Sequence, residues 1–423
     1  MRTRRVVVKI IYYYANLLGV TSIRLDFETH QIRQNIWTVL YSALANIVLL
    51  VSLPFAIKSG MYYLKLYQEN KLLIIMDATN TIIRCSVLIF TVLLRLKREK
   101  SYKKLAKLIF NLDQCYFRKL EANEEIERRS HILFLCKVFT TGGQSLALAF
   151  NMWQTSRRSL DVGMILLICY FTTVHNFIHG VMLHYYGALL QAYTRYCMLN
   201  VQLRKLLETL SRFCDNTEGL LHKESFTFQQ LSRLAAADLY EISCIYMKLT
   251  RIVWSLNHDY QYYVFAVLMS YLIYNVAYGY NLFLILDGTL NSGGSHFTFA
   301  FGGSCMCLLF ADLFLFYWTC EATTQSSQST SRLFKEISGL LVLSKMDPEF
   351  ERHVGRLSWI LPLSHFICFI KKLCFSFAVR AVLAAANAMP GEHRDYGHVR
   401  AEHAILAGLV EFYAATHPYP GAI

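Results

Sequence analysis

Six long apolar stretches dominate the pattern of hydrophobic and polar positions along this chain of 423 residues. Polar segments separate them, and they run over Ile36–Ile57, Leu72–Leu94, Ile132–Met152, Val162–Tyr186, Gln261–Leu286 and Phe297–Trp318. At about 1.5 Å of rise per residue, each stretch is long enough to cross a hydrocarbon core of about 30 Å as a helix. The pattern therefore predicts an all-α, multi-pass transmembrane helical bundle with six clear spans, and it shows no sign of strands.

The composition supports a membrane protein. Hydrophobic residues make up 55% of the chain, charged residues 17%, and the mean hydropathy is +0.32. The formal net charge of +13 is also typical of proteins that bind nucleic acid, but the basic residues cluster beside the apolar stretches. In that position they act as orientation signals that face anionic cytoplasmic lipids. We therefore expect the lipid bilayer as a partner, and no nucleic acid.

The distribution of Lys and Arg between the stretches predicts the orientation of the chain. These residues are crowded into the segment before Ile36 and into the loop from Arg95 to Arg129, after the second stretch. The loops after the first and third stretches hold few of them, and Asp287–His296 holds none. Since positive residues favour the cytoplasmic side, the N-terminus and the even-numbered loops are expected inside the cell.

The predicted inner loops are long and have helical periodicity. Leucines recur at spacings of three and four from Leu199 to Leu210, and similar stripes follow over Leu239–Leu256 and Leu333–Leu341. Such stripes predict that the fourth, fifth and sixth helices continue beyond the bilayer and pack together as a cytoplasmic helical base. The C-terminal region is different: Trp359–Phe377 is interrupted by His and Lys, and no clear seventh membrane helix is visible.

These observations predict four regions. Residues 1–35 form a cytoplasmic N-terminal segment, and residues 36–318 form the six-span bundle, including the long helical inner loop 188–260. Residues 319–377 form a cytoplasmic helix and a membrane re-entry region. Residues 378–423 form an atypical C-terminal tail.

Two short motifs contain residue types that serve in signalling or metal binding in other proteins. Thr194-Arg195-Tyr196 is similar to the Asp-Arg-Tyr motif of G-protein-coupled receptors, but it follows the fourth span, lacks the acid and accompanies an inside N-terminus. Arg195 is therefore interpreted as a residue that snorkels to the interface. His175 and His179 have metal-ligand spacing, but no carboxylate or thiol is placed to join them, and they are interpreted as hydrogen-bonded bundle histidines. No catalytic motif is found, so we expect neither an enzyme nor a bound cofactor.

Polar residues inside the apolar stretches indicate a ligand-binding region, because burying them in lipid is costly. Arg84 is expected either to pair with Asp77 through a neighbour or to face a water-filled cavity. The candidate binding residues, all placed in the outer halves of the second, third, fifth and sixth spans, are Asp77, Arg84, Asn151, Trp153, Tyr274, Tyr278, Asn281, Phe301 and Ser304. Aromatic rings with hydroxyl groups suit a small organic ligand. The alternative is that Tyr and Trp form an interfacial belt and hold the bundle together.

Several local features resemble the insect gustatory receptors. Lys9-Ile10-Ile11-Tyr12-Tyr13-Tyr14 is followed by Leu17-Leu18-Gly19 and Leu25-Asp26-Phe27, and Tyr116-Phe117-Arg118 precedes the third span. Short outer loops, long helical inner loops and an inside N-terminus match the same family. The resemblance covers about Met1–Phe377.

This resemblance implies a seven-helix subunit of a homo- or hetero-tetrameric, ligand-gated cation channel in the plasma membrane of chemosensory neurons. It also implies a tastant pocket in the outer half of the bundle and a pore lined by the seventh helix. The family's Thr-Tyr and Gln-Phe signature does not occur after Lys372, so no pore residue is assigned. The alternatives are a non-conducting variant product, a G-protein-coupled receptor, and a membrane transporter or enzyme.

Overall fold

The computed structural model describes residues 12–26, 31–67, 71–117, 124–156, 162–217, 226–286 and 295–342. The first eleven residues, the predicted membrane re-entry region over 343–377 and the tail 378–423 lie outside this described part.

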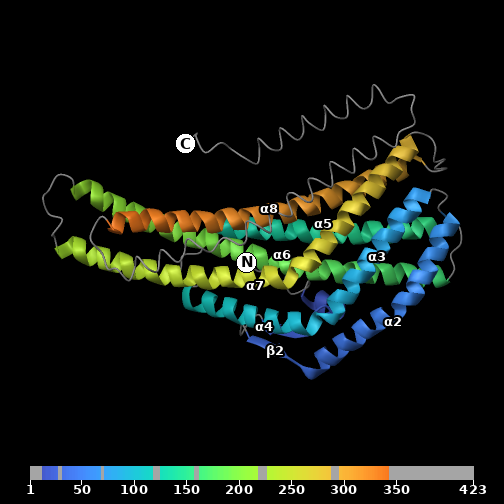
Figure 1. Cartoon of the computed structure of the whole chain (residues 1–423), viewed down its shortest axis with the longest axis horizontal. Helices are drawn as coiled ribbons and strands as arrows, with labels where there is room; N and C mark the ends of the chain where they lie inside the picture. Colours follow the sequence, from blue (N-terminus) through green and yellow to red (C-terminus); the bar gives the residue numbers. More distant parts are fainter. Residues whose placement is uncertain are drawn as a thin grey trace.

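Long helices make up most of the described chain (Figure 1). They are α2 (Ile36–Tyr67), α3 (Lys71–Leu93), α4 (Arg95–Leu112), the π-helical turn η1 (Asp113–Phe117), α5 (Glu124–Ser156), α6 (Val162–Thr217), α7 (Phe226–Leu286) and α8 (Ser295–Val342). Each predicted apolar stretch falls within one helix, except that the second helix ends one residue earlier than predicted. Four helical segments are long and apolar enough to cross a membrane: Ile36–Tyr62, Ile74–Leu93, Glu124–Phe150 and Val162–Arg212. The predicted all-α, multi-pass bundle is confirmed, and four of its six predicted spans meet this criterion among the described residues.

The helices α6, α7 and α8 are far longer than a bilayer is thick. They contain 56, 61 and 48 residues, which correspond to lengths of about 70 to 90 Å at the α-helical rise. Figure 1 shows them continuing together past the ends of α2 and α3. Leucine positions from the predicted stripes, such as Leu203, Leu239 and Leu249, have no exposed surface in this extension. The stripes are therefore buried where these helices pack on one another.

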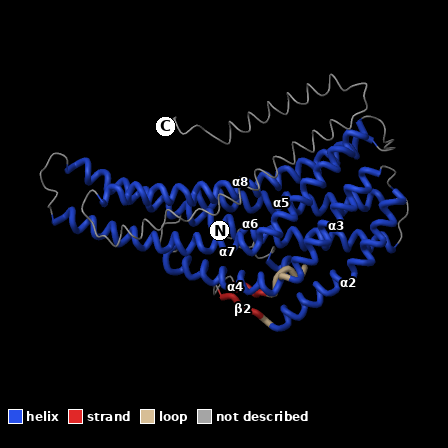
Figure 2. Tube along the Cα trace, in the orientation of Figure 1, coloured by secondary structure: helices blue, strands red, loops and turns tan. Residues whose placement is uncertain are grey.

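A short β-hairpin precedes α2. The strand β1 (Ile23–Asp26) pairs antiparallel with β2 (Gln31–Gln34), and Figure 2 shows this element in red among the helices. The expectation that the chain has no strands was wrong at this point. Alternation of apolar and polar residues along Ile23-Arg24-Leu25-Asp26 has the period of two that a half-buried strand requires, and Ile23 is buried.

The segment before the hairpin is anchored to α2 and α4. Ser22 donates from its backbone N–H and its hydroxyl to the Glu99 carboxylate, at 2.7 and 2.8 Å, and Glu99 also pairs with Arg95 at 3.3 Å. The chain reverses at Gly19, which has a φ of +74°. A side chain at Gly19 would meet the Cβ of Ala45 at 3.1 Å. Glycine is needed here for both the left-handed backbone and the close approach to α2.

The helix α6 lies at the centre of the bundle. It contacts α2, α3, α5, α7 and α8. Its side chains Phe177, Tyr186 and Leu199 have no exposed surface and belong to one continuous apolar core. Polar side chains on α6 are therefore brought against several helices at once, and this position creates the site described next.

Candidate functional site

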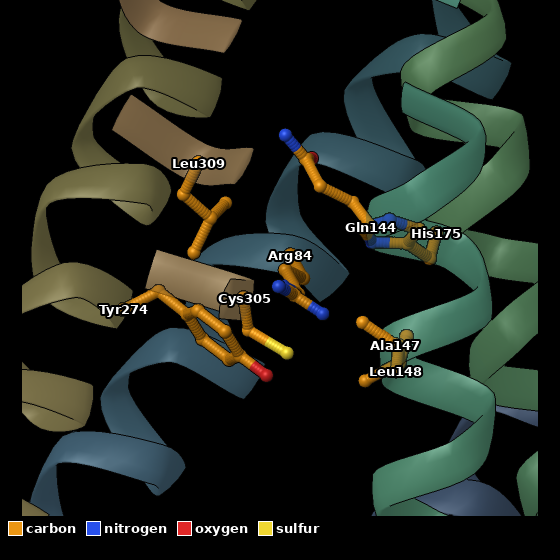
Figure 3. A pocket seen from close by; sticks show the side chains of 8 residues that line it. All are labelled: Arg84, Gln144, Ala147, Leu148, His175, Tyr274, Cys305 and Leu309. Atoms are coloured by element: carbon orange, nitrogen blue, oxygen red, sulfur yellow. The ribbon is translucent and has the colours of Figure 1, made fainter. Parts of the chain in front are cut away.

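A small cavity lies where α3, α5, α6, α7 and α8 meet (Figure 3). Its lining combines charged, polar and apolar side chains, namely Arg84, Gln144, Ala147, Leu148, His175, Tyr274, Cys305 and Leu309. The space inside is sufficient for about one water molecule. In this conformation the helices are nearly closed around the polar groups.

Arg84 is the charged residue of this cavity. It is half-buried on α3, and its guanidinium carbon lies 5.1 Å from the centre of the Tyr274 ring on α7, which is within cation–π distance. Figure 3 shows its guanidinium extending between Tyr274 and the side chains of α5. Within the described chain no ion pair joins Arg84 to Asp77. Of the two arrangements expected for Arg84, the structure shows the one that faces a cavity.

A second, smaller cavity adjoins the first, and Arg84 and His175 line both. Its other lining residues come from α3, α6 and α7: Val87, Ile178, His179, Val267, Ser270 and Tyr271. Ser270 donates a hydrogen bond of 2.6 Å to the Oδ1 of Asn80, which joins α7 to α3 beside this cavity. The two cavities form one polar region around Arg84.

Two histidines of α6 connect the cavities to a buried hydrogen-bond network. The rings of His175 and His179 lie 3.9 Å apart, centre to centre. The Tyr271 hydroxyl lies 2.9 Å from the Nδ1 of His179 and donates to the Oδ2 of Asp312 at 3.2 Å. Because the hydroxyl has a single proton, it accepts the proton of His179 when it donates to Asp312. The prediction that these are hydrogen-bonded bundle histidines is confirmed for His179. It is not met at the Nε2 of His175, which is buried without a hydrogen-bond partner among the described residues.

A buried ion pair lies at the far end of this network. The Nζ of Lys137 on α5 is 2.6 Å from the Oδ2 of Asp312 on α8, and both side chains are at most 1% exposed. Thr140 donates to the other carboxylate oxygen, Oδ1, at 2.7 Å. The ammonium group also lies 5.5 Å from the centre of the Tyr186 ring. The Asp312 carboxylate therefore holds α5, α7 and α8 together. Its contacts offset the free-energy cost of removing the two charges from water.

The structure brings together some of the predicted binding residues. Arg84 and Tyr274 line the first cavity. Asp77 is half-buried on α3 but lines neither cavity, and Ser304 is exposed on α8. The other five, Asn151, Trp153, Tyr278, Asn281 and Phe301, lie within α5, α7 and α8, but their side chains are outside the described part.

Sequence reasoning did not identify Gln144, Lys137 and Asp312 as parts of this region. Lys137 is a lone charge in the third apolar stretch and Asp312 is a lone charge in the sixth. Isolated charges in membrane spans are themselves a signal of function or pairing. That signal identifies the residues, whereas their pairing depends on how α5 and α8 are rotated about their axes.

Arg195 has a different role from the predicted one. It does not snorkel to the surface: its side chain is 7% exposed and pairs with Asp113 of η1. The Nε and Nη2 atoms lie 2.9 and 2.5 Å from the two carboxylate oxygens, and Nη1 donates to the side chain of Gln191 at 3.0 Å. An acidic partner, which the local motif lacks, is therefore present, and it comes from a distant segment that the π-helical turn places against α6.

The side chains of this region are of types that are suited to binding a ligand. Among the described residues, no group of three or more His, Cys, Asp or Glu side chains is close enough to hold a metal ion. A guanidinium, an imidazole, an amide and an aromatic ring instead face a small space lined by apolar side chains. Few convergent polar groups in an apolar pocket are typical of a site for a small organic molecule.

Comparison with known proteins gives a match over nearly the whole chain. A family model described as 7tm Chemosensory receptor matches residues 8–370, which include every helix of the cavity. No curated protein matches the chain.

Proposed function

The chain belongs to the 7tm chemosensory receptor family, and from this premise we propose that it is a gustatory receptor subunit. In this proposal it is a ligand-gated cation channel that detects tastants and depolarises sensory neurons. It works in the plasma membrane as a homo- or hetero-tetramer with other gustatory receptor subunits. Its N-terminus is cytoplasmic, as the distribution of basic residues favours.

The cavity beside Arg84 is the observation that carries this proposal. It joins α3, α5, α6, α7 and α8 inside the bundle, and polar groups in it lie beside apolar ones. A site of this kind in a family of chemosensory receptors is suited to a small ligand that enters from the outer half of the membrane.

The small size of the cavity supports a gating mechanism. Because its space holds about one water molecule, a tastant fits only when the surrounding helices move apart. A ligand that binds the wider conformation shifts the population of receptors toward it. The network from His179 through Tyr271 to Asp312 joins α6, α7 and α8, so a displacement at the cavity reaches the long helices that extend beyond it.

Current recordings test the proposed function. Cells that express the full chain, alone and with candidate partner subunits, are exposed to a panel of tastants while surface expression is measured. Tyr274→Ala removes a cavity side chain, and Tyr262→Ala is the matched control because Tyr262 lies on the same helix and is 78% exposed. We expect Tyr274→Ala to raise the half-maximal tastant concentration about tenfold or more, whereas Tyr262→Ala leaves it unchanged.

Three results would contradict the proposal. The first is the absence of current in every combination despite confirmed surface expression. The second is an equal effect of Tyr274→Ala and Tyr262→Ala. The third is an epitope tag at Met1 that antibodies reach on unpermeabilised cells, because this orientation belongs to a G-protein-coupled receptor.

A further inference from the structure

We propose that the cavity beside Arg84 selects small organic acids in their carboxylate form, with a hydroxyl or ammonium group next to the carboxylate. This inference rests on the proposed function in one respect, namely that a small ligand reaches this cavity. It concerns binding, and it does not require that the chain conducts ions.

The charge of the cavity favours an anion. Among the described side chains that line the two cavities none is acidic, and Arg84 is the permanently charged one. The nearby Lys137 and Asp312 neutralise each other at 2.6 Å and add no net charge. Among the described residues Arg84 forms no ion pair, and the Asp77 carboxylate on the same helix acts on its charge only at longer range; a guanidinium in this situation inside a membrane bundle is costly. A ligand carboxylate removes this cost, because guanidinium and carboxylate form two parallel hydrogen bonds.

Two unpaired polar atoms belong to side chains of the same cavity, and one of them indicates what else the ligand carries. Among the described residues, neither the Nε2 of His175 nor the Oε1 of Gln144 has a hydrogen-bond partner, and their side chains are 5% and 6% exposed. The amide nitrogen of Gln144 donates to the backbone carbonyl of Leu308 at 3.4 Å, so its oxygen is the end left to accept. Buried acceptors without donors are costly. A hydroxyl or ammonium group beside the carboxylate satisfies this oxygen.

The remaining lining restricts the size and polarity of the ligand. Ala147, Leu148 and Leu309 contribute apolar surface, which suits a short carbon chain and does not suit a hydrated inorganic anion. The space is narrow in this conformation. Lactate and alanine, each with a carboxylate, an adjacent donor and one methyl group, are therefore the probes that match the site.

Competition binding to the full-length protein in lipid nanodiscs tests the inference without a current. Radiolabelled lactate is the probe. Propionate lacks the hydroxyl, lactamide lacks the charge, glycerol is a neutral polyol, and chloride is an inorganic anion. We expect alanine to compete with lactate, propionate to bind about tenfold more weakly, and lactamide about 10- to 100-fold more weakly. Glycerol and chloride are expected not to compete.

Substitutions test whether lactate binds at the cavity beside Arg84. Arg84→Gln is expected to weaken lactate binding about 10- to 100-fold, whereas Lys58→Gln, which removes an exposed charge on α2, leaves it unchanged. Gln144→Ala should reduce the difference between lactate and propionate. Size-exclusion profiles check folding. If Arg84→Gln does not fold, Arg84→Lys retains the charge, and the ligand series on the unmodified protein decides the question alone.

The outcomes separate this inference from the proposed function. Absence of lactate and alanine binding, equal competition by lactamide or glycerol, or equal effects of Arg84→Gln and Lys58→Gln would overturn the inference. Lactate binding with the expected selectivity but no current would support the inference and contradict the channel function. Currents evoked by a neutral sugar, with no binding of lactate, would support the channel and overturn the inference.

Discussion

Lys137 and Asp312 form an ion pair of 2.6 Å in the interior of the bundle, although they lie on different helices, α5 and α8. Asp312 also accepts hydrogen bonds from Thr140 and Tyr271. One carboxylate thus joins three helices, and through Tyr271 and His179 it reaches the side chains that line the cavities. The stability of the bundle and the shape of the candidate site therefore depend on the same group.

Replacing one partner of this ion pair is expected to destabilise the protein more than replacing both partners. Lys137→Met or Asp312→Asn leaves one buried charge without its partner, at a cost of about 3–5 kcal/mol. In the double variant neither charge is present, and the Asn oxygen still accepts from Thr140, so most of the loss is recovered. Thermal unfolding of the purified protein and cell-surface labelling measure the effect. A double variant as unstable as the worse single variant would contradict this coupling.

The sequence allowed the helices to be predicted well, because long apolar stretches have one stable arrangement in a bilayer. It also identified Arg84 and Tyr274 as unusual within their spans. The partners of charged residues were harder to predict. Arg195 meets Asp113 only because a π-helical turn follows α4, and the pairing of Lys137 with Asp312 depends on the rotation of two helices. Apolar periodicity specifies a buried face, but it does not specify the opposing residue.

The pair between Arg195 and Asp113 is expected to respond asymmetrically to substitution. The side chain of Arg195 is 7% exposed, whereas that of Asp113 is 38% exposed. Asp113→Ala therefore leaves a buried guanidinium with only part of its hydrogen bonds, at a cost of about 2–3 kcal/mol. Arg195→Leu leaves a carboxylate that water can solvate, at a cost of about 1 kcal/mol or less. Thermal unfolding of both variants gives the comparison, and the opposite order would show that the pair is not held as described.

The turn at Gly19 offers a test of the N-terminal packing. Gly19→Ala places a side chain on a backbone with a φ of +74° and at 3.1 Å from Ala45. We expect a loss of stability of about 1–3 kcal/mol, measured as a lower midpoint of thermal unfolding. Gly142→Ala on α5 is the matched control because its added Cβ meets no atom within 4 Å. That variant should be neutral or slightly stabilising, since alanine favours a helix more than glycine. Similar losses in both variants would argue against a specific role of Gly19.

Protection of an introduced cysteine shows whether a ligand occupies the cavity beside Arg84. Ala147→Cys places a thiol in the cavity lining, and Leu146→Cys places one on the adjacent residue, which is 74% exposed on α5. Labelling of each position by a small, membrane-permeant thiol reagent is followed by peptide mass spectrometry, with and without the strongest agonist from the current recordings. We predict that the agonist slows labelling at residue 147 and leaves residue 146 unchanged. Equal labelling of residue 147 in the presence and absence of a saturating agonist would contradict binding at this cavity.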